Sequence, residues 1–274
     1  MNASQTPRVV VITGASDGIG AEIARQLAAS EGAGVALVLA ARNAAQLEAV
    51  AAECAALGAQ SLALPTDVGV QIQCRRLVIS AVERFGRIDV LVNNAGRSAH
   101  ALFEEVEDLG WYEELMRVNL WGSVWCTQAA LPHLKLTRGS IVAVSSLAGL
   151  IGVPGRTAYS ATKFAMTGFF EALRAEVKGA GVSVTTAYPG VVATRIRYRG
   201  YNAQGEAMGR SALNEEGAMT VEECARLIIA GMNGRRREVV MTAKGKLGRF
   251  LKLLAPGLVE KMALAALKKD VRPH

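Results

Sequence analysis

Apolar runs and amphipathic segments alternate along this chain. The runs 8–13 (RVVVIT) and 35–41 (VALVLAA) are apolar almost without interruption, as in strands buried on both faces of a parallel sheet. Small and apolar residues at helical spacing fill segments between such runs, for example over 21–29 and 157–178. The alternation predicts an α/β fold with a doubly wound, parallel, seven-stranded sheet. Strands are expected near residues 8–13, 34–40, 61–65, 88–92, 139–145, 182–188 and 238–242.

The length and composition of the chain limit the number of domains and the kind of core that it can form. Its 274 residues are enough for one domain with a large core, and hydrophobic residues make up 51% of them. Aromatic residues make up only 5%, so we expect an aliphatic core. We predict one domain over 1–243 followed by a basic, amphipathic C-terminal tail over 244–274.

A glycine-rich turn follows the first predicted strand directly. Gly14, Gly18 and Gly20 lie between that strand and the helix expected from residue 21. Glycine lets the backbone turn tightly and approach a pyrophosphate, and the N-terminus of a helix favours negative charge. The spacing G-x-x-x-G-x-G differs from the commonest dinucleotide fingerprint, but strand, turn and helix in this order predict a dinucleotide site.

The residues at the end of the second predicted strand help to distinguish an NAD site from an NADP site. An acidic residue there would bind the adenine ribose 2′-hydroxyl of NAD, but Ala41 holds the position and Arg42 follows it. An arginine suits a 2′-phosphate. Asp17 in the glycine turn argues the other way, because it places a negative charge near the same phosphate. We expect NADP(H), with NAD(H) as the less favoured cofactor.

Tyr159 and Lys163 are four residues apart on a predicted helix, so their side chains share one face. A nearby ammonium favours the phenolate and lowers the pKa of a tyrosine, which suits it to proton transfer with a carbonyl or alcohol oxygen. Ser146 follows the apolar run 140–145 and would hold that oxygen by a hydrogen bond. The pattern predicts hydride transfer between a nicotinamide and a carbonyl or alcohol carbon.

With these motifs in view, the chain resembles the short-chain dehydrogenase/reductase family in its single-domain, Rossmann-type branch, over about residues 8–242. The resemblance implies a catalytic tetrad of Asn119, Ser146, Tyr159 and Lys163. In that tetrad Tyr159 is the acid–base, Lys163 also binds the nicotinamide ribose, and Asn119 supports a water-linked proton relay. The implied cofactor contacts are Gly14, Ser16, Asp17, Gly18, Ile19, Gly20, Arg42, Asp67, Val68, Asn94, Ala95, Gly96, Tyr159, Lys163, Pro189, Gly190, Val192 and Thr194.

The resemblance implies an NADP(H)-dependent oxidoreductase, such as a carbonyl reductase, and a homodimer or homotetramer. The strand end that leads to Arg42 is similar to that of relatives of the hydroxysteroid dehydrogenases. One alternative is a non-catalytic dinucleotide sensor or scaffold, but the intact tetrad argues against it. Another is a lipid or steroid reductase that its tail docks on a membrane surface. Trp121 and Trp125 follow Asn119 on the same expected helix, and we expect them to pack in the core or at a subunit interface.

Residues 191–220 follow the sixth predicted strand and are expected to form a mobile substrate lid, because loops of this length are usually functional or disordered. We expect the substrate to meet Ser98, Leu147, Val153, Tyr188 and Arg195. This mixture of apolar and few charged groups favours a medium or large hydrophobic carbonyl or alcohol.

The C-terminal tail carries most of the charge. Residues 235–274 hold eleven Lys or Arg against three Asp or Glu, while the other residues hold 20 basic and 21 acidic side chains. Pro256 and Gly257 divide the tail into two amphipathic segments. Such segments can lie on an anionic membrane surface, pack on a neighbouring subunit, cover the pocket, or remain a frayed, solvated end. No aromatic platform or recognition motif supports binding of nucleic acid.

Cysteine, histidine and the N-terminus add little. The four cysteines and three histidines are scattered without metal-ligand spacing, so we expect no metal site. Residues 1–7 lack an apolar signal segment, and no uninterrupted apolar run reaches the length of a transmembrane helix. We expect a cytoplasmic protein, or one peripheral at a membrane surface.

Overall fold

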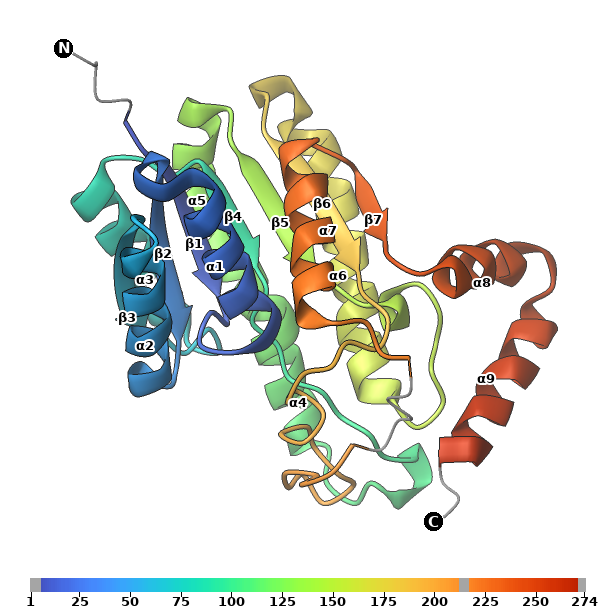
Figure 1. Cartoon of the computed structure of the whole chain (residues 1–274). Coiled ribbons are helices and arrows are strands. Elements are labelled where there is room, and N and C mark those ends of the chain that lie inside the picture. Colours follow the sequence, from blue (N-terminus) through green and yellow to red (C-terminus); the bar gives the residue numbers. More distant parts are fainter. Residues whose placement is uncertain (1–5, 212–216, 271–274) are drawn as a thin grey trace.

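Seven parallel strands form one twisted sheet in the order β3-β2-β1-β4-β5-β6-β7 (Figure 1). The computed structural model describes residues 6–211 and 217–270, so parts of the predicted domain (1–5), lid (212–216) and tail (271–274) lie outside the described residues. The predicted sheet is confirmed, with every strand boundary within two residues of its expected position. The strands are β1 (Arg8–Thr13), β2 (Val35–Ala41), β3 (Gln60–Pro65), β4 (Val90–Asn93), β5 (Ser140–Val144), β6 (Ser183–Tyr188) and β7 (Glu238–Val240).

Helices cover both faces of this sheet (Figure 1). On one face lie α1 (Gly18–Glu31), α2 (Ala44–Ala56) and α7 (Val221–Asn233). On the other lie α3 (Gln71–Phe85), α5 (Gly122–Thr137) and α6 (Thr157–Val177). The short α4 (Gly110–Met116) continues through a π-helical turn, Arg117–Trp121, into α5. The tail forms α8 (Ala243–Leu254) and α9 (Pro256–Asp270).

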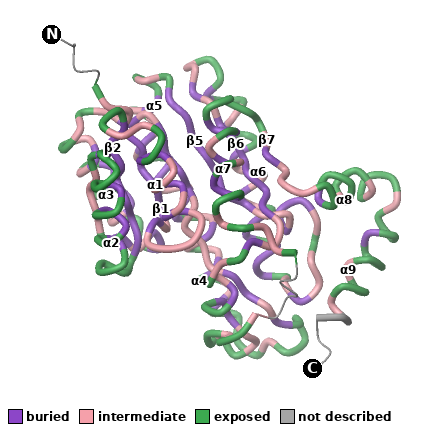
Figure 2. The backbone as a smooth tube through the Cα atoms, viewed as in Figure 1, coloured by how far each residue is buried: buried purple, intermediate pink, exposed green. Residues whose placement is uncertain are grey.

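An aliphatic core lies on each face of the sheet, as the purple strands of Figure 2 indicate. Val10 and Ile12 of β1 contribute to the core beneath α1, while Val9 and Val11 contribute to the core beneath α3 and α5. This is the two-residue period of a strand. A strand buried on both faces needs apolar residues at every position, which explains its unbroken apolar sequence.

The chain reverses its direction of travel across the sheet between β1 and β4. From β1 it winds outward to β2 and β3, and from β4 it winds the other way to β5, β6 and β7. Such a reversal leaves a crevice at the carboxyl ends of the strands. Thr13 joins the two central strands there, because its Oγ1 accepts hydrogen bonds from the backbone N–H groups of Asn94 and Ala95, both at 3.0 Å.

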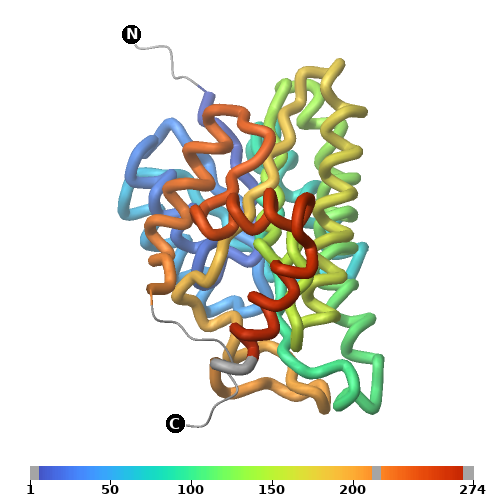
Figure 3. The backbone as a smooth tube through the Cα atoms, turned by 90° about the vertical axis from the view of Figure 1, so that its right-hand side faces the viewer, coloured from blue at the N-terminus to red at the C-terminus, as the bar shows by residue number. Residues whose placement is uncertain are grey.

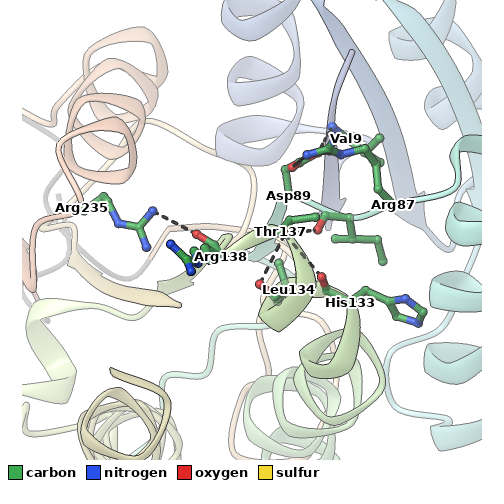
Figure 4. A network of polar contacts seen from close by, with 9 residues as sticks. Val9, Arg87, Asp89, His133, Leu134, Thr137, Arg138 and Arg235 are labelled. Carbon is green, nitrogen blue, oxygen red and sulfur yellow. Dashed lines mark hydrogen bonds and ion pairs between the residues drawn. The ribbon is translucent and has the colours of Figure 1, made fainter. Parts of the chain in front are cut away.

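A polar network closes the opposite edge of the sheet, at the amino ends of the strands (Figure 4). The backbone N–H of Val9 donates to Asp89 Oδ2 at 2.9 Å. Arg87 donates to both carboxylate oxygens of Asp89, from Nε at 2.9 Å and from Nη2 at 2.6 Å. Thr137 Oγ1 donates to the carbonyl of Ile88 at 2.8 Å. The network therefore ties β1, β4 and α5 together away from the crevice.

No helix among the described residues is long and apolar enough to cross a lipid bilayer. The tail begins where the sheet ends, since β7 closes at Val240 and α8 starts at Ala243.

We predict that Asp89→Ala lowers the free energy of unfolding by about 1–3 kcal/mol, because it leaves the N–H of Val9 without its acceptor and removes the partner of Arg87. Urea unfolding followed by circular dichroism measures the change. Glu48→Ala, on the exposed side of α2, is the control and should change stability by less than about 0.5 kcal/mol. Equal stabilities of the two variants would show that the network does not stabilise the fold.

Candidate active site

A cavity of about 1460 Å³ opens at the carboxyl ends of the strands. Pockets for single drug-sized ligands are usually about 300–1,000 Å³, so this cavity has room for a dinucleotide and a second molecule. Its wall combines the loops after β1 to β6 with parts of the tail. Among the described residues, no group of three His, Cys, Asp or Glu side chains is placed to hold a metal ion.

Most of the residues predicted from the sequence line this one cavity. The lining includes the predicted cofactor contacts apart from Gly20, three members of the tetrad, and three of the predicted substrate contacts. These residues are Gly14, Ser16, Asp17, Gly18, Ile19, Arg42, Asp67, Val68, Asn94, Ala95, Gly96, Ser146, Tyr159, Lys163, Pro189, Gly190, Val192, Thr194, Leu147, Val153 and Arg195.

The glycine turn has the shape of a phosphate cradle. Gly14 and Gly18 adopt φ values of 66° and 55°, where side chains are strained. A Cβ on Gly14 would lie 2.8 Å from Ala95 Cα, and one on Gly20 would lie 2.4 Å from the carbonyl oxygen of Gly14. Gly20 therefore packs inside the turn and supports it from behind. The open N-terminus of α1 follows, so the turn fits a pyrophosphate.

The end of the cavity beside the glycine turn and β2 carries Arg42 and an acidic residue, Asp17, that forms an ion pair. Arg42 lines the cavity just beyond the end of β2. The carboxylate of Asp17 accepts from the N–H of Gly18 at 2.7 Å, which caps α1. It also forms an ion pair with Arg199 from the lid. The charge of Asp17, which argued against a 2′-phosphate, is therefore balanced by a cation.

Tyr159 and Lys163 point from one face of α6 toward the end of β5. Lys163 Nζ donates to the carbonyl of Val144 at 2.9 Å and lies 5.8 Å from the centre of the Tyr159 ring. Ser146 lines the same cavity as Tyr159, and its Oγ accepts from the N–H of Ala148 at 3.2 Å. Tyr159 and Lys163 are only 7% and 3% exposed, so their charges act where water screens them little.

The surrounding charges favour the phenolate form of Tyr159. Burial alone would raise the pKa of Tyr159, but Lys163, Arg156 and the hydrogen bond from Ser146 together lower it below its ordinary value. Burial lowers the pKa of the Lys163 ammonium, and Tyr159 opposes that effect. The surrounding charges and burial therefore bring the pKa values of both Tyr159 and Lys163 closer to neutral pH. Proton transfer is most effective when the pKa of the transferring group lies near the working pH.

Asn119 lies behind the cavity wall, in the π-helical turn before α5. Its side chain is fully buried. The Oδ1 atom accepts from the N–H of Arg97 at 2.7 Å, and Nδ2 donates to the carbonyl of Arg97 and to Thr162 Oγ1, both at 3.0 Å. Asn119 thus joins the loop after β4 to α6, one residue before Lys163. Its part in a proton relay stays a prediction.

Arg156 is a site residue that the sequence motifs did not reveal. Its guanidinium carbon lies 4.1 Å from the centre of the Tyr159 ring, closer than the ammonium of Lys163. Its donors reach neutral oxygens, the carbonyl of Ala99 at 3.2 Å and Ser98 Oγ at 2.7 Å. Arg156 lies three residues before Tyr159 but outside α6, which begins at Thr157, so no helical spacing in the sequence indicated it.

Two predicted substrate contacts, Tyr188 and Ser98, do not line the cavity. Tyr188 is only 1% exposed and does not line the cavity, because it is the last residue of β6 and its side chain points to a covered face of the sheet. Ser98 is 4% exposed and is held in the protein interior by its hydrogen bond with Arg156. Both residues therefore lie in the protein interior, outside the cavity lining.

The described parts of the predicted lid form one side of the cavity. Its two ends are tied together, since Met219 donates to the carbonyl of Val191 at 2.9 Å and Ala193 donates to that of Met219 at 3.0 Å. Arg195 and Arg197 both line the cavity from this segment. Whether the lid moves stays a prediction.

Comparisons with known proteins agree with this geometry. A family model described as short chain dehydrogenase matches residues 8–204. The chain is 36% identical to 11-beta-hydroxysteroid dehydrogenase 1A of Arabidopsis thaliana, over 92% of this chain and 73% of that protein. It is 33% identical to dehydrogenase/reductase SDR family protein 7-like of Dictyostelium discoideum, over 97% of this chain and 85% of that protein.

Two solved structures share the fold. An alcohol dehydrogenase from the archaeon Thermococcus sibiricus, complexed with 5-hydroxy-NADP, superposes with a TM-score of 0.73 at 28% identity, covering 85% of this chain and 94% of that one. A short chain dehydrogenase/reductase from Burkholderia phymatum in complex with NAD gives a TM-score of 0.79 at 25% identity, covering 93% and 96%.

We predict that Arg156→Gln raises the pKa of Tyr159, because it removes a cation beside the ring. Alcohol oxidation needs the phenolate as base, so the rise of kcat/KM with pH should move to higher pH. Arg156→Lys keeps the charge and should stay closer to the wild-type profile. Identical profiles for all three proteins would show that Arg156 only holds the loop at Ala99.

Proposed function

Because this chain belongs to the short-chain dehydrogenase/reductase family, and so is an oxidoreductase acting on CH–OH groups, we propose that it interconverts a carbonyl and a secondary alcohol with NADP(H). The substrate is a medium or large apolar molecule of steroid-like size. The observation that carries the proposal is the buried pair of Tyr159 and Lys163, which lines the same cavity as Ser146 and the glycine cradle. A proton donor and a dinucleotide site in one cavity are the two parts that such a reaction requires.

When bound, the nicotinamide supplies or accepts the hydride at the substrate carbon. The side chains of this chain manage the proton and the charge on oxygen. In reduction, Tyr159 gives its hydroxyl proton to the carbonyl oxygen, and Lys163 and Arg156 stabilise the phenolate that remains. In oxidation, the phenolate takes the proton of the alcohol. Ser146 orients the substrate oxygen by a hydrogen bond in both directions.

Two features support NADP(H) over NAD(H). Arg42 lines the cavity where an acidic residue would otherwise select the ribose 2′-hydroxyl of NAD. Asp17, the acid nearest to the turn, is already paired with Arg199. One structural relative was solved with an NADP analogue and another with NAD, so the family accommodates both, and the charges of this chain favour the phosphorylated form.

The wall beyond Tyr159 supports an apolar substrate. Leu147, Ile151 and Val153 line it from the loop after β5. Ala263, Ala266 and Leu267 line it from α9, which brings the tail to the cavity. Hydroxysteroid dehydrogenases among the relatives are consistent with a large, rigid, apolar molecule. Of the alternatives open for the tail, a contribution to the pocket is therefore the one that this wall supports.

We also propose a homo-oligomer that forms through α5 and α6. Trp121, the last residue of the π-helical turn before α5, is 48% exposed and stacks on Trp125 of α5 with ring centres 6.0 Å apart. Phe164 on α6 is 37% exposed. Trp121 lies outside the cavity wall, so its exposed ring suits a subunit contact better than contact with substrate.

We predict that Tyr159→Phe lowers kcat/KM by about 10²–10⁴-fold, because it removes the transferable proton and keeps the ring. Steady-state kinetics with a panel of ketones and steroids measures the loss, and nicotinamide fluorescence should show that NADPH still binds. Tyr188→Phe is a matched control, since it removes one hydroxyl from another buried tyrosine and should leave the rate nearly unchanged. A loss of less than about tenfold in Tyr159→Phe, about 1.4 kcal/mol of barrier, would mean that another group transfers the proton.

We predict that Arg42→Ala weakens binding of NADPH by about tenfold or more, because it removes a charge-assisted contact to the 2′-phosphate. Binding of NADH should change much less. Fluorescence titration with both cofactors measures this, with Arg75→Ala on the exposed side of α3 as the control. Equal losses for NADPH and NADH would rule out a 2′-phosphate contact at Arg42.

A further inference from the structure

The tail helix α8 packs on the protein through its glycine face. A Cβ on Gly245 would lie 2.4 Å from Leu147 Cδ2, and one on Gly248 would lie 2.8 Å from Ile151 Cδ1. Lys252, on the same face, donates from Nζ to the carbonyl of Leu150 at 2.9 Å. Close backbone approach, not burial of leucine, therefore fixes α8 to the wall of the active site.

The apolar face of α8 points away from the protein. Leu247, Phe250 and Leu254 lie at i, i+3 and i+7 and are 57%, 59% and 69% exposed. Leu253 beside them is 79% exposed. An amphipathic helix of a globular protein normally turns this stripe toward the core. A contiguous exposed apolar stripe indicates a binding surface.

Helix α9 extends this surface to the mouth of the cavity. Its inner side contributes Ala263 and Leu267 to the cavity wall, while Leu258 and Met262 are 49% and 58% exposed. Figure 3 shows α8 and α9, in red, in front of the rest of the molecule. One helix pair thus presents apolar side chains outward and borders the cavity on its inner side.

Basic residues alternate with the apolar residues along both tail helices. Lys244, Lys246 and Arg249 come from α8 and Lys261 from α9, and Glu260 is the only acid between residues 243 and 267. Arg249 pairs with Glu238 of the body. A second copy of this chain would bring equal positive charge to the same surface, whereas an anionic lipid surface complements both the charge and the leucines.

We infer that α8 and α9 dock the protein on an anionic lipid bilayer, with the exposed stripe in the interface and the lysines at the headgroups. The cavity mouth beside α9 then lies close to the lipid. An apolar substrate could enter from the bilayer along α9, a consequence that rests on the proposed function. Docking itself does not depend on the reaction.

The test compares two variants in co-sedimentation with vesicles of phosphatidylcholine, alone or mixed with phosphatidylglycerol. Leu247→Ser with Leu254→Ser removes two exposed leucines at i and i+7 of α8. Ile72→Ser with Ile79→Ser removes two isoleucines that are 50% and 53% exposed, also at i and i+7, on α3. Helix α3 lies at the opposite end of the molecule in Figure 1, so this pair is a matched control.

The wild type and the α3 variant should sediment with the mixed vesicles, and added salt should weaken that binding. The α8 variant should bind at least about tenfold more weakly. A wild type that stays in solution, or an α8 variant that binds as well as the wild type, would overturn the inference. A third outcome would also overturn the inference. If neither the wild type nor the variants bind vesicles, and light scattering shows a dimer for the wild type but not for the α8 variant, then a second copy of the chain covers this face. Because sedimentation needs no cofactor, binding without turnover would count against the proposed function alone.

Discussion

The close approach of the turn after β1 to the end of β4 is the contact on which the rest of the site depends. Backbone meets backbone there, because a Cβ on Gly14 would come within 2.8 Å of Ala95 Cα. Asn94 closes the contact by donating from Nδ2 to the carbonyls of Thr13 and Gly14, at 3.0 and 3.2 Å. The two strands at which the chain reverses are thereby locked together, and the cradle lies above them.

That contact is linked to the proton chemistry through a short series of hydrogen bonds. The loop after Asn94 leads to Arg97, whose backbone is held at both N–H and carbonyl by Asn119. Asn119 in turn reaches Thr162 on α6, next to Lys163. The same helix carries Tyr159, so one rigid path relates the cofactor cradle to the acid–base. A rigid path matters because catalysis depends on the reacting groups being held in place before reaction.

The sheet and most of the site could be predicted because their causes are local. A buried parallel strand needs an unbroken apolar run, and a phosphate turn needs glycine at positive φ, so both leave a mark in a few neighbouring residues. Arg156 left no such mark, since its proximity to Tyr159 depends on the turn that brings Ser98 and Ala99 to its guanidinium. The orientation of the Tyr188 side chain could not be predicted for a related reason. Its place beside a cofactor motif was evident, but the pleat of β6 decided which way its side chain points.

The tail shows why an amphipathic pattern alone does not settle what a helix binds. Pro256 and Gly257 predicted a division of the tail into two amphipathic segments, and the tail forms two helices, α8 and α9, of which α8 has a clear apolar face. The periodicity of apolar residues defines an apolar face of a helix but not whether that face points inward or outward. Because amphipathic helices usually turn their apolar face to the core, the leucines of α8 would be expected to point inward. Glycines at 245 and 248 reverse that choice, because two helix positions without side chains let the backbone come closer to Leu147 and Ile151 than leucine would allow. The close fit of the two glycines therefore decides which face of α8 points inward. The leucines on the outward face stay exposed, and a partner outside this chain could bury them.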